Sequence, residues 1–264
     1  MPEISVLLPV YNPDIRMLTQ AVNSILNQTY SDFELLIYDD GSIDSIATEI
    51  RSLAECDSRI RLITGDAHHN IAYGLNTLVR ESRGKYLARM DSDDVSKSQR
   101  LEIEYRFMEE NPEIDFVGSN LELIDEDGEA YGERKYPIRP EARDFLKYQP
   151  YAHPAMMFRR AVLRGENPYG TKVGNRRGED YEMLMKLVSE GAKGYNLQEN
   201  LLSYRECPGS YSRRKLRFQL EEVGIRWNGF KALGLNRFRF LGYVLKPIAV
   251  WMVPNRLAFR LKHK

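Results

Sequence analysis

The chain has 264 residues, 42% of them hydrophobic, which is enough to bury a sizeable core in one large α/β domain or two smaller ones. No apolar run reaches about 18 residues and Met1-Pro2-Glu3 leads straight into a strand-like segment, so we expect neither a membrane-spanning helix nor a signal peptide. The two cysteines, Cys56 and Cys207, match neither a disulfide framework nor a zinc pattern, which favours a reducing cytoplasm.

The net charge of zero conceals a strong asymmetry along the chain. Residues 211–264 carry 13 Lys and Arg against 2 Asp and Glu, so this segment has a net charge of +11 and residues 1–210 have −11. Such a basic segment predicts an anionic partner, and a membrane surface and a nucleic acid are the two candidates.

In the first part of the chain, β-rich runs alternate with segments whose apolar residues recur at helical spacing. Pro9 is expected to end the first strand and Asp14 to cap the first helix. Four such alternations predict a parallel sheet with right-handed crossovers, whose ligands bind at the carboxyl ends of the strands. The expected strands are Ile4–Leu8, Phe33–Tyr38, Arg61–Thr64 and Lys85–Met90, and the expected helices are 14–26, 44–53 and 73–81.

Polar loops follow three of these strands and together predict a nucleotide site. They are Pro9-Val10-Tyr11-Asn12, Asp39-Asp40-Gly41-Ser42 and Asp91-Ser92-Asp93-Asp94. The sequence contains neither a GxGxxG fingerprint nor a Walker A motif, so dinucleotide-binding and P-loop proteins lack support.

Asp91, Asp93 and Asp94 place three carboxylates within four residues, where the buried central strand must end. Close carboxylates repel one another, and Mg²⁺ or Mn²⁺ removes that penalty by binding one or two of them together with substrate phosphate oxygens. The alternative is a solvated acidic turn in which Asp94 caps the next helix. A calcium loop is set aside, because its fifth and sixth positions would be Val95 and Ser96.

Beyond Asp94 the alternation loosens. A helix over 97–110, strands at 114–118 and 121–124 and a turn at Asp127-Gly128 predict a mixed, partly antiparallel half.

A loop rich in glycine and cations, residues 170–178, opens onto Glu179-Asp180 and a further helix. Acids at a helix N-terminus are stabilised by the macrodipole and by free N–H groups, so spacing alone makes Asp180 simply a cap.

These segments, in this order and spacing, resemble the inverting family-2 glycosyltransferases of GT-A fold, although no single motif is specific. The resemblance implies an α/β domain over residues 1–210, with a Rossmann-like nucleotide-sugar half (1–95), a mixed, partly antiparallel acceptor half (96–210) and a helical tail (211–264). It rests on Val6–Asn12, Ser24–Tyr30 with Phe33–Leu35, Asp39–Ser42, Gly84–Asp94 and Glu179-Asp180.

The resemblance also implies how the nucleotide is bound. Pro9 and Tyr11 would contact the base, with Tyr11 stacking on it, and Asn12 belongs to the same nucleotide-binding loop. Asp40 would accept a hydrogen bond from the N3–H of uracil.

The remaining roles concern the reaction itself. Asp91 and Ser92 would face the ribose and the diphosphate, and Asp93 would bind the divalent metal, Mn²⁺ or Mg²⁺. Asp180 would be the catalytic base, which takes the proton of the acceptor hydroxyl on the face opposite the departing diphosphate.

Three further residues are weaker candidates. His153 and Arg205, as donors or cations, are expected either to contact the diphosphate or acceptor or to have structural roles. Glu179 is a candidate for the same contacts because it adjoins Asp180.

Two departures from the family pattern bear on specificity. Where the family often has Asn-x-Gly, this sequence reads His68-His69-Asn70, so base and sugar contacts there are open. The Gln-x-x-Arg-Trp signature of processive synthases is incomplete, because Val223 precedes Arg226-Trp227 in place of glutamine, which argues for one sugar per encounter.

The end of the basic tail, residues 238–254, is apolar and rich in aromatic side chains, with bases at its edges. Pro247 interrupts this run and Lys246 lies within it, so we expect residues 237–264 to lie in a membrane interface and not to span the bilayer. The alternative is a helix packed on its own domain. A nucleic-acid partner is not expected, because the run is too apolar and no recognition motif accompanies the charge.

The sequence therefore predicts a cytoplasmic enzyme on the inner face of the cell membrane, which transfers sugar from a UDP-sugar to a glycan or lipid-linked saccharide during surface-polysaccharide synthesis. A nucleotidyltransferase that forms sugar nucleotides is one alternative, but it would need a glycine-rich, arginine-bearing loop after the first strand. A non-catalytic module that binds nucleotide sugars is the other.

Overall fold

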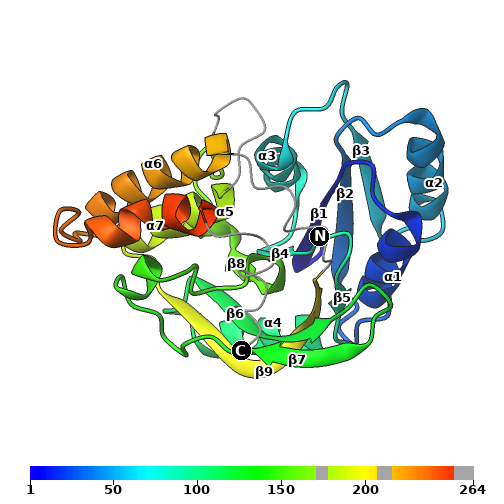
Figure 1. Ribbon diagram of the computed structural model, residues 1–264. Coiled ribbons are helices and arrows are strands. Elements are labelled where there is room, and N and C mark those ends of the chain that lie inside the picture. Colours follow the sequence, from blue (N-terminus) through cyan, green and yellow to red (C-terminus); the bar gives the residue numbers. More distant parts are fainter. Residues whose placement is uncertain (171–177, 207–215, 253–264) are drawn as a thin grey trace.

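The structure is a computed structural model that describes residues 1–170, 178–206 and 216–252 (Figure 1). Most of the predicted glycine- and cation-rich loop, the expected domain boundary at 210 and the last part of the tail lie outside these residues. The strands are β1 (Ile4–Val10), β2 (Phe33–Asp39), β3 (Ile60–Thr64), β4 (Tyr86–Arg89), β5 (Val95–Ser96), β6 (Phe116–Ile124), β7 (Ala130–Arg134), β8 (Met157–Arg159) and β9 (Gly194–Arg205). The α-helices are α1 (Ile15–Leu26), α2 (Asp44–Ala54), α3 (Ile71–Glu81), α4 (Arg100–Glu110), α5 (Glu179–Ser189), α6 (Leu216–Ala232) and α7 (Leu241–Trp251).

These strands form one sheet with the order β3-β2-β1-β4-β8-β6-β9-β5, and β7 pairs with β6. The first four strands are parallel, as predicted. Beyond β4 the sheet is mixed, because β8 is antiparallel to both β4 and β6 whereas β9 is parallel to β6. The prediction of a parallel nucleotide-type half followed by a mixed half is confirmed.

Helices cover both faces of the sheet (Figure 1). Apolar side chains of α1, α2 and α4 pack on one face, and those of α3 and α5 pack on the other. On this second side α6 packs against α5, and α7 packs against α6. Because β1, β2 and β4 are parallel, the loops that follow them leave the sheet at the same edge, where ligands bind in sheets of this type.

The prediction that Pro9 ends the first strand is wrong, because β1 continues to Val10. Pro9 has no N–H, but its nitrogen points to the side where β4 would lie, and β4 pairs with β1 only as far as Leu7. The other side remains bonded, since the Asp40 N–H donates to the Val10 carbonyl at 2.9 Å. A proline at an unpaired strand edge removes no hydrogen bond.

The expected break between residues 118 and 121 is also absent, because β6 runs without interruption and its pairing with β9 only shifts register there. The Asn120 side chain explains how the irregularity is tolerated. It accepts a hydrogen bond from the Tyr136 N–H at 2.8 Å and donates to the Gln198 carbonyl at 2.9 Å, which replaces lost ladder bonds.

Pro247 does not end a helix either, since α7 passes through it. A proline in a helix leaves the carbonyl four residues earlier without its donor, and here that carbonyl belongs to Tyr243. The Arg226 Nη1 atom of α6 approaches the Tyr243 oxygen to 3.5 Å and also donates to the Leu146 carbonyl at 3.2 Å. Within residues 216–252, α6 and α7 thus pack on the rest of the domain. In the part of the chain that the structure describes, every helix is too short or too polar to cross a bilayer.

Candidate active site

The loops after β1 and β2 are bonded to each other through Asn12. Its backbone lies in the left-handed region (φ 44°), which asparagine tolerates better than most residues. The Asn12 N–H donates to Ser42 Oγ, and Asn12 Oδ1 accepts from the Ile43 N–H, both at 2.9 Å. The Asn12 side-chain oxygen is therefore used to join the two loops.

The resemblance predicts that Tyr11 and Asp40 recognise the base. The side chain of His68 lies between them and fills the space that we call the slot. The ring of Tyr11 is exposed and stacks on that of His68, with 3.7 Å between centroids and 18° between planes. His68 Nδ1 lies 2.9 Å from Asp40 Oδ2, and the His69 N–H donates to Asp40 Oδ1 at 3.0 Å. Pro9, partly exposed, precedes this slot on β1. Burial raises the pKa of Asp40, and the contacts with His69 and His68 oppose that rise.

The three acids of the loop after β4 have different surroundings. Asp91 is partly exposed and forms an ion pair with the buried Arg89, and Ser92 beside it is also partly exposed. Asp93 is exposed, yet desolvation by the surrounding protein and the charge of Asp91 raise its pKa. Asp94 is fully buried and accepts a hydrogen bond from the backbone of β9, so the alternative that it caps the next helix is wrong. That helix, α4, begins after Gln99.

Arg205 lies behind this loop and not in front of it. Its N–H donates to Asp94 Oδ1 at 2.9 Å, and its Nε donates to the Asp93 carbonyl at 2.8 Å. The rest of the guanidinium is bonded to Gln20 and to the carbonyls of Asp125 and Glu126. With these partners Arg205 supports the backbone of the acidic loop from the rear.

Glu179 and Asp180 form the first turn of α5 after Gly178, whose left-handed conformation (φ 88°) starts the helix. Gln149 Nε2 donates to Asp180 Oδ2 at 3.0 Å, so an amide fixes the orientation of the carboxylate. Burial raises the pKa of Asp180, and burial together with the Asp180 charge raises that of Glu179.

Asp180, Gln149 and His153 line a cavity of about 570 Å³, whose other walls include residues of β6, β7 and β9. His153 is buried, and its Nε2 lies 3.0 Å from the Tyr169 hydroxyl. Burial and the charge of Arg89 hold the pKa of His153 far below its usual value, so it is neutral. Asp93 does not line this cavity.

Arg89 connects the acidic loop electrostatically with α5. Its guanidinium is 2% exposed, and its charge lowers the pKa values of both Asp93 and Asp180. The charge of Asp91 acts in the opposite direction on the same two carboxyls and raises both pKa values. The main chain joins the two regions as well: the Arg89 N–H donates to the Met156 carbonyl at 2.8 Å, and His153, three residues before Met156, lines the cavity of Asp180. The acidic loop, which follows Arg89, and the start of α5 therefore adjoin one region of the protein.

The donor set suits a cation that binds mainly to substrate. No cluster of three or more His, Cys, Asp or Glu side chains that could cage a metal exists among residues 1–170, 178–206 and 216–252. Mg²⁺ and Mn²⁺ need only one or two carboxylates when phosphate oxygens supply the remaining ligands. The exposed carboxylate of Asp93, whose negative charge is disfavoured by its surroundings, fits that requirement.

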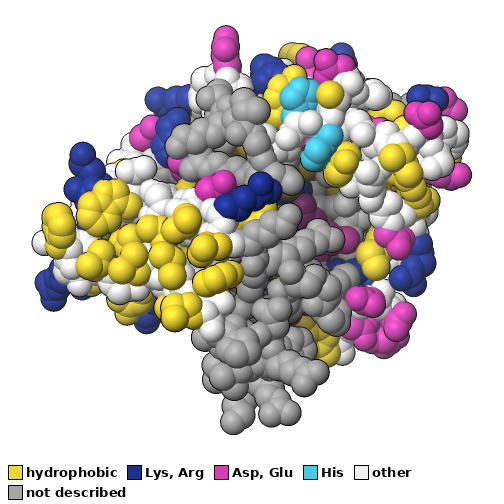
Figure 2. Space-filling model, turned by 45° about the horizontal axis from the view of Figure 1, so that its top comes forward, with side chains coloured by type: hydrophobic (Ala, Val, Ile, Leu, Met, Phe, Trp, Pro, Cys, Tyr) yellow, Lys and Arg dark blue, Asp and Glu magenta, His cyan; other side chains and the backbone are white. Residues whose placement is uncertain are grey.

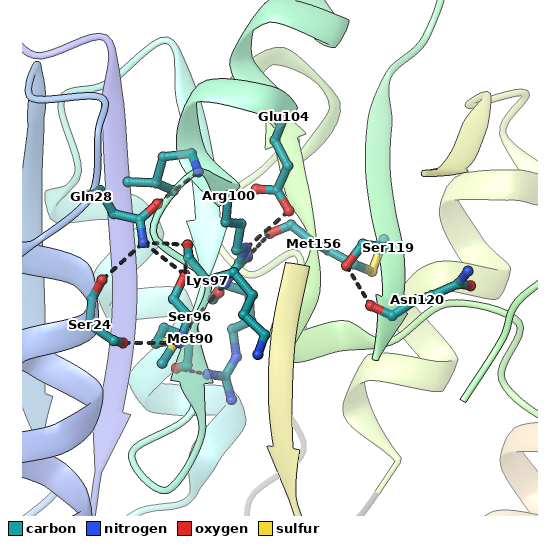
Figure 3. Close-up of polar contacts among 12 residues, drawn as sticks. Ser24, Gln28, Met90, Ser96, Lys97, Arg100, Glu104, Ser119, Asn120 and Met156 are labelled. Atoms are coloured by element: carbon teal, nitrogen blue, oxygen red, sulfur yellow. Dashed lines mark hydrogen bonds and ion pairs between the residues drawn. The ribbon is translucent and has the colours of Figure 1, made fainter. Parts of the chain in front are cut away.

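A buried polar network, which few sequence patterns indicate, supports the acidic loop (Figure 3). Arg100 bonds Glu104 at 3.0 Å and the carbonyl of Arg89 at 2.9 Å, directly before the acidic loop. Gln28 donates to Ser96 Oγ at 3.1 Å and to the Lys97 carbonyl at 2.8 Å. These contacts fix both ends of the loop. Sequence reasoning missed Arg89, Arg100 and Gln149 as supporting residues. Gln149 bonds a side chain 31 residues away and Arg100 bonds a backbone carbonyl, whereas the near pairs Arg89–Asp91 and Arg100–Glu104 give no sign in the sequence that the arginines are buried.

The chain belongs to glycosyl transferase family 2, whose family model matches residues 5–165. It is 31% identical over 264 residues to EpsE of Bacillus subtilis (strain 168), a protein named as a glycosyltransferase, and covers 94% of that chain. It is 36% identical over 206 residues to the O-antigen biosynthesis glycosyltransferase WbnJ of Escherichia coli, which is 76% of this chain and 79% of WbnJ. It is also 25% identical to the UDP-Gal:alpha-D-GlcNAc-diphosphoundecaprenol beta-1,3-galactosyltransferase of Escherichia coli, over 96% of this chain and 93% of that enzyme.

Two solved structures are similar in fold. TarS residues 1–349 of S. aureus, in complex with UDP-GlcNAc, matches 94% of this chain and 72% of its own with a TM-score of 0.72 at 17% identity. The mannosyltransferase PcManGT of Pyrobaculum calidifontis, in complex with GDP-Man and Mn²⁺, matches 97% of this chain and 72% of its own with a TM-score of 0.65 at 17% identity. The expected GT-A architecture is thereby confirmed.

Proposed function

We propose that this glycosyltransferase moves one sugar per encounter from a UDP-sugar to a saccharide acceptor, with inversion at the anomeric carbon and with a divalent metal. Residues 1–210 would form the catalytic unit, with a nucleotide-sugar half (1–95) and an acceptor half (96–210). The observation that carries the proposal is that Arg89, directly before the acidic loop, is bonded to the Met156 carbonyl, close to His153, which lines one cavity with Asp180. An acid that would bind the metal, Asp93, and an acid that would serve as the base, Asp180, both at one region of the protein, suit an in-line displacement.

The chemistry assigns different tasks to the two acids. Asp93, with Asp91 and Ser92 beside the ribose and diphosphate, would hold Mn²⁺ or Mg²⁺, which when bound supplies positive charge to the departing diphosphate. Asp180 would take the proton of the acceptor hydroxyl, and Gln149 would keep its carboxylate oriented. Burial raises the pKa of Asp180, which makes its carboxylate a stronger base than that of an ordinary aspartate.

A UDP-linked donor agrees with the slot at Pro9, Tyr11 and Asp40, since an aromatic face and a carboxylate acceptor match the ring and the N3–H of uracil. Two of the similar proteins use or bind a UDP-sugar according to their names. A metal is supported by the Mn²⁺ complex of PcManGT.

For the acceptor we propose a glycan or lipid-linked saccharide of surface-polysaccharide synthesis. One relative is named for O-antigen biosynthesis and another for a sugar carried on diphosphoundecaprenol. The cavity beside Asp180 would receive the acceptor, with Glu179 and His153 near the reacting group. Val223 stands where processive synthases have glutamine, which favours addition of a single sugar.

A screen of nucleotide sugars by thermal shift tests the donor. With Mn²⁺ present, UDP-sugars at about 100 times their Kd should stabilise the fold by about 2.7 kcal/mol and raise the melting temperature by several degrees. Slow release of UDP from the preferred donor should also occur and should stop with EDTA. Greater stabilisation by GDP- or dTDP-sugars would overturn the UDP assignment, and release of UDP unaffected by EDTA would overturn the metal.

The apolar side chains of the α6–α7 end support a peripheral position on the inner face of the cell membrane. Figure 2 shows hydrophobic side chains gathered there. Phe238, Leu245 and Met252 are 75%, 42% and 73% exposed. The only acids within residues 216–252 are Glu221 and Glu222, against six Lys and Arg. An apolar surface with a positive surplus suits anionic headgroups, so we propose that residues 237–264 dock on such a membrane.

Serine substitution of these three exposed side chains tests the membrane proposal. We expect Phe238→Ser/Leu245→Ser/Met252→Ser to bind phosphatidylglycerol-containing vesicles at least about tenfold more weakly in sedimentation assays, since each buried methylene contributes about 0.8 kcal/mol. UDP affinity should not change. The control, Ile43→Ser, alters a side chain that is 60% exposed at the start of α2 and should leave vesicle binding unaltered. Equal vesicle affinity of the triple variant and the wild type would refute the membrane role.

A further inference from the structure

The side chain of His68 makes the two contacts that a nucleobase would need in the same slot. Its ring lies on Tyr11 with 3.7 Å between centroids, which is the spacing of stacked rings and leaves no room for a base between them. Its Nδ1 lies 2.9 Å from Asp40 Oδ2. An ionised carboxylate has no proton to give, so Nδ1 carries the hydrogen and donates it.

The backbone around His68 is fixed at both ends, whereas its side chain is held by these two contacts. Before it, the Gly65 N–H donates to the Asp39 carbonyl at 2.8 Å. After it, Asn70 Oδ1 accepts from the Tyr73 N–H at 3.0 Å and caps α3. The ring is about one-third exposed, so rotation of the side chain alone can move it from the slot into solvent.

The neighbouring His69 has a different position. Its ring stacks on Tyr73 with 4.0 Å between centroids and 10° between planes. Its Nδ1 lies 3.7 Å from Asp40 Oδ1, beyond hydrogen-bond distance, whereas its backbone N–H donates to the same oxygen at 3.0 Å. A change of the His69 side chain therefore leaves the ring of His68 on Tyr11 and the backbone hydrogen bond in place.

We propose that His68 is a placeholder for the nucleobase: it occupies the slot between Tyr11 and Asp40 in the free protein and must leave before a nucleotide binds. A base that takes its place must bring an N–H for Asp40 Oδ2, because a base without a donor there would leave a buried carboxylate oxygen unpaired. Uracil, thymine and guanine carry this donor on the ring, as His68 does, whereas cytosine and adenine have donors only on an exocyclic amino group. The inference rests on the proposed function, which makes this slot the base site, and it adds a residue that weakens binding and restricts the base.

The test compares the UDP and CDP affinities of the full chain and two variants by calorimetry with Mg²⁺. If the slot is open in about one molecule in ten, His68→Ala should bind UDP about tenfold more tightly than the wild type. His69→Ala should agree with the wild type within about twofold, because its ring is outside the slot. The wild type should bind CDP more weakly than UDP. Proton NMR of the wild type gives a check without substitution: the His68 ring signals, shifted upfield by the face of Tyr11, should move on addition of UDP.

Each result of these measurements either supports or contradicts the placeholder proposal. Weaker or unchanged UDP binding by His68→Ala would overturn the placeholder proposal. His68 ring signals that do not move when UDP binds would overturn it as well. His68 would then either support the bound base or take no part in binding. Equal affinity of the wild type for UDP and CDP would overturn the selection by ring N–H. If UDP binds as proposed in these cases, the proposed function stands. Failure of all three proteins to bind any nucleoside diphosphate would overturn the proposed function and this inference with it.

Discussion

Replacement of Asp180 by asparagine is expected to lower the rate of sugar transfer about a thousandfold, the range typical of a lost general base, and to leave UDP binding unchanged. Asparagine has nearly the shape of aspartate but cannot take a proton. Its one oxygen can accept from the Tyr181 N–H, and Gln149 with its amide turned over can accept from its NH2 group, so both contacts of Asp180 have replacements. Stability should not fall, because burial and the Asp91 charge already disfavour the ionised carboxylate. The measurements are UDP release with and without acceptor, UDP affinity and the melting temperature.

The matched control is Glu182→Gln in the same first turn of α5. Glu182 lines a different cavity, formed with α6 and residues 167–170, so its loss should change the transfer rate by less than about threefold. A thousandfold loss in this control would mean that any acid at the helix N-terminus matters through the helix dipole. An active Asp180→Asn variant would remove Asp180 as the base and would return it to the role of a cap.

Replacement of Arg100 by methionine is expected to destabilise the protein by about 3–5 kcal/mol, because it leaves a buried carboxylate without its partner. Arg100 and Glu104 are both fully buried and bond at 3.0 Å. Burial raises the pKa of Glu104 to about 7 even with Arg100 present. Without the guanidinium this pKa rises further, so the folded protein holds a proton that the unfolded chain releases. Stability should therefore fall as pH rises, and the deficit should be larger at pH 8 than at pH 5.

Two variants separate the causes in urea-unfolding experiments. Arg106→Met removes an exposed arginine from the same helix, where it pairs with Glu102, and should cost less than about 1 kcal/mol. Arg100→Met/Glu104→Leu removes both charges and should recover most of the loss, since apolar pairs of similar size replace buried ion pairs well. Any remaining loss would measure the Arg100 bond to the Arg89 carbonyl, which should also lower activity through the acidic loop. An Arg100→Met variant as stable as Arg106→Met would refute the buried-charge argument.

The sequence by itself determined the elements and the edge of the sheet at which the site lies. Apolar spacing marked the strands and helices of the first half, and Asp14 does cap α1 through the Met17 N–H. Once these strands are parallel, their carboxyl ends share one edge, so the loops that carry Tyr11, Asp40 and Asp93 could be predicted to lie together without coordinates, and the family resemblance singled out these residues within them. The sequence pattern is sufficient for those features of the fold that depend only on the periodicity of each segment and on the direction of the strands.

Only the tertiary structure decided which side chains face the site and which support it. In the sequence, Arg205 is open to a contact with the diphosphate or acceptor or to a structural role, and the register of β9 places it behind Asp93, 112 residues earlier, where backbone carbonyls accept from its guanidinium. His68 reads as a departure from a motif, yet packing puts its ring on Tyr11. The reason is physical. The spacing of residues along the chain reflects the periodicity of each helix or strand. Contacts between distant parts of the chain depend instead on strand register and on the geometry of the crossovers, which no short stretch of sequence determines.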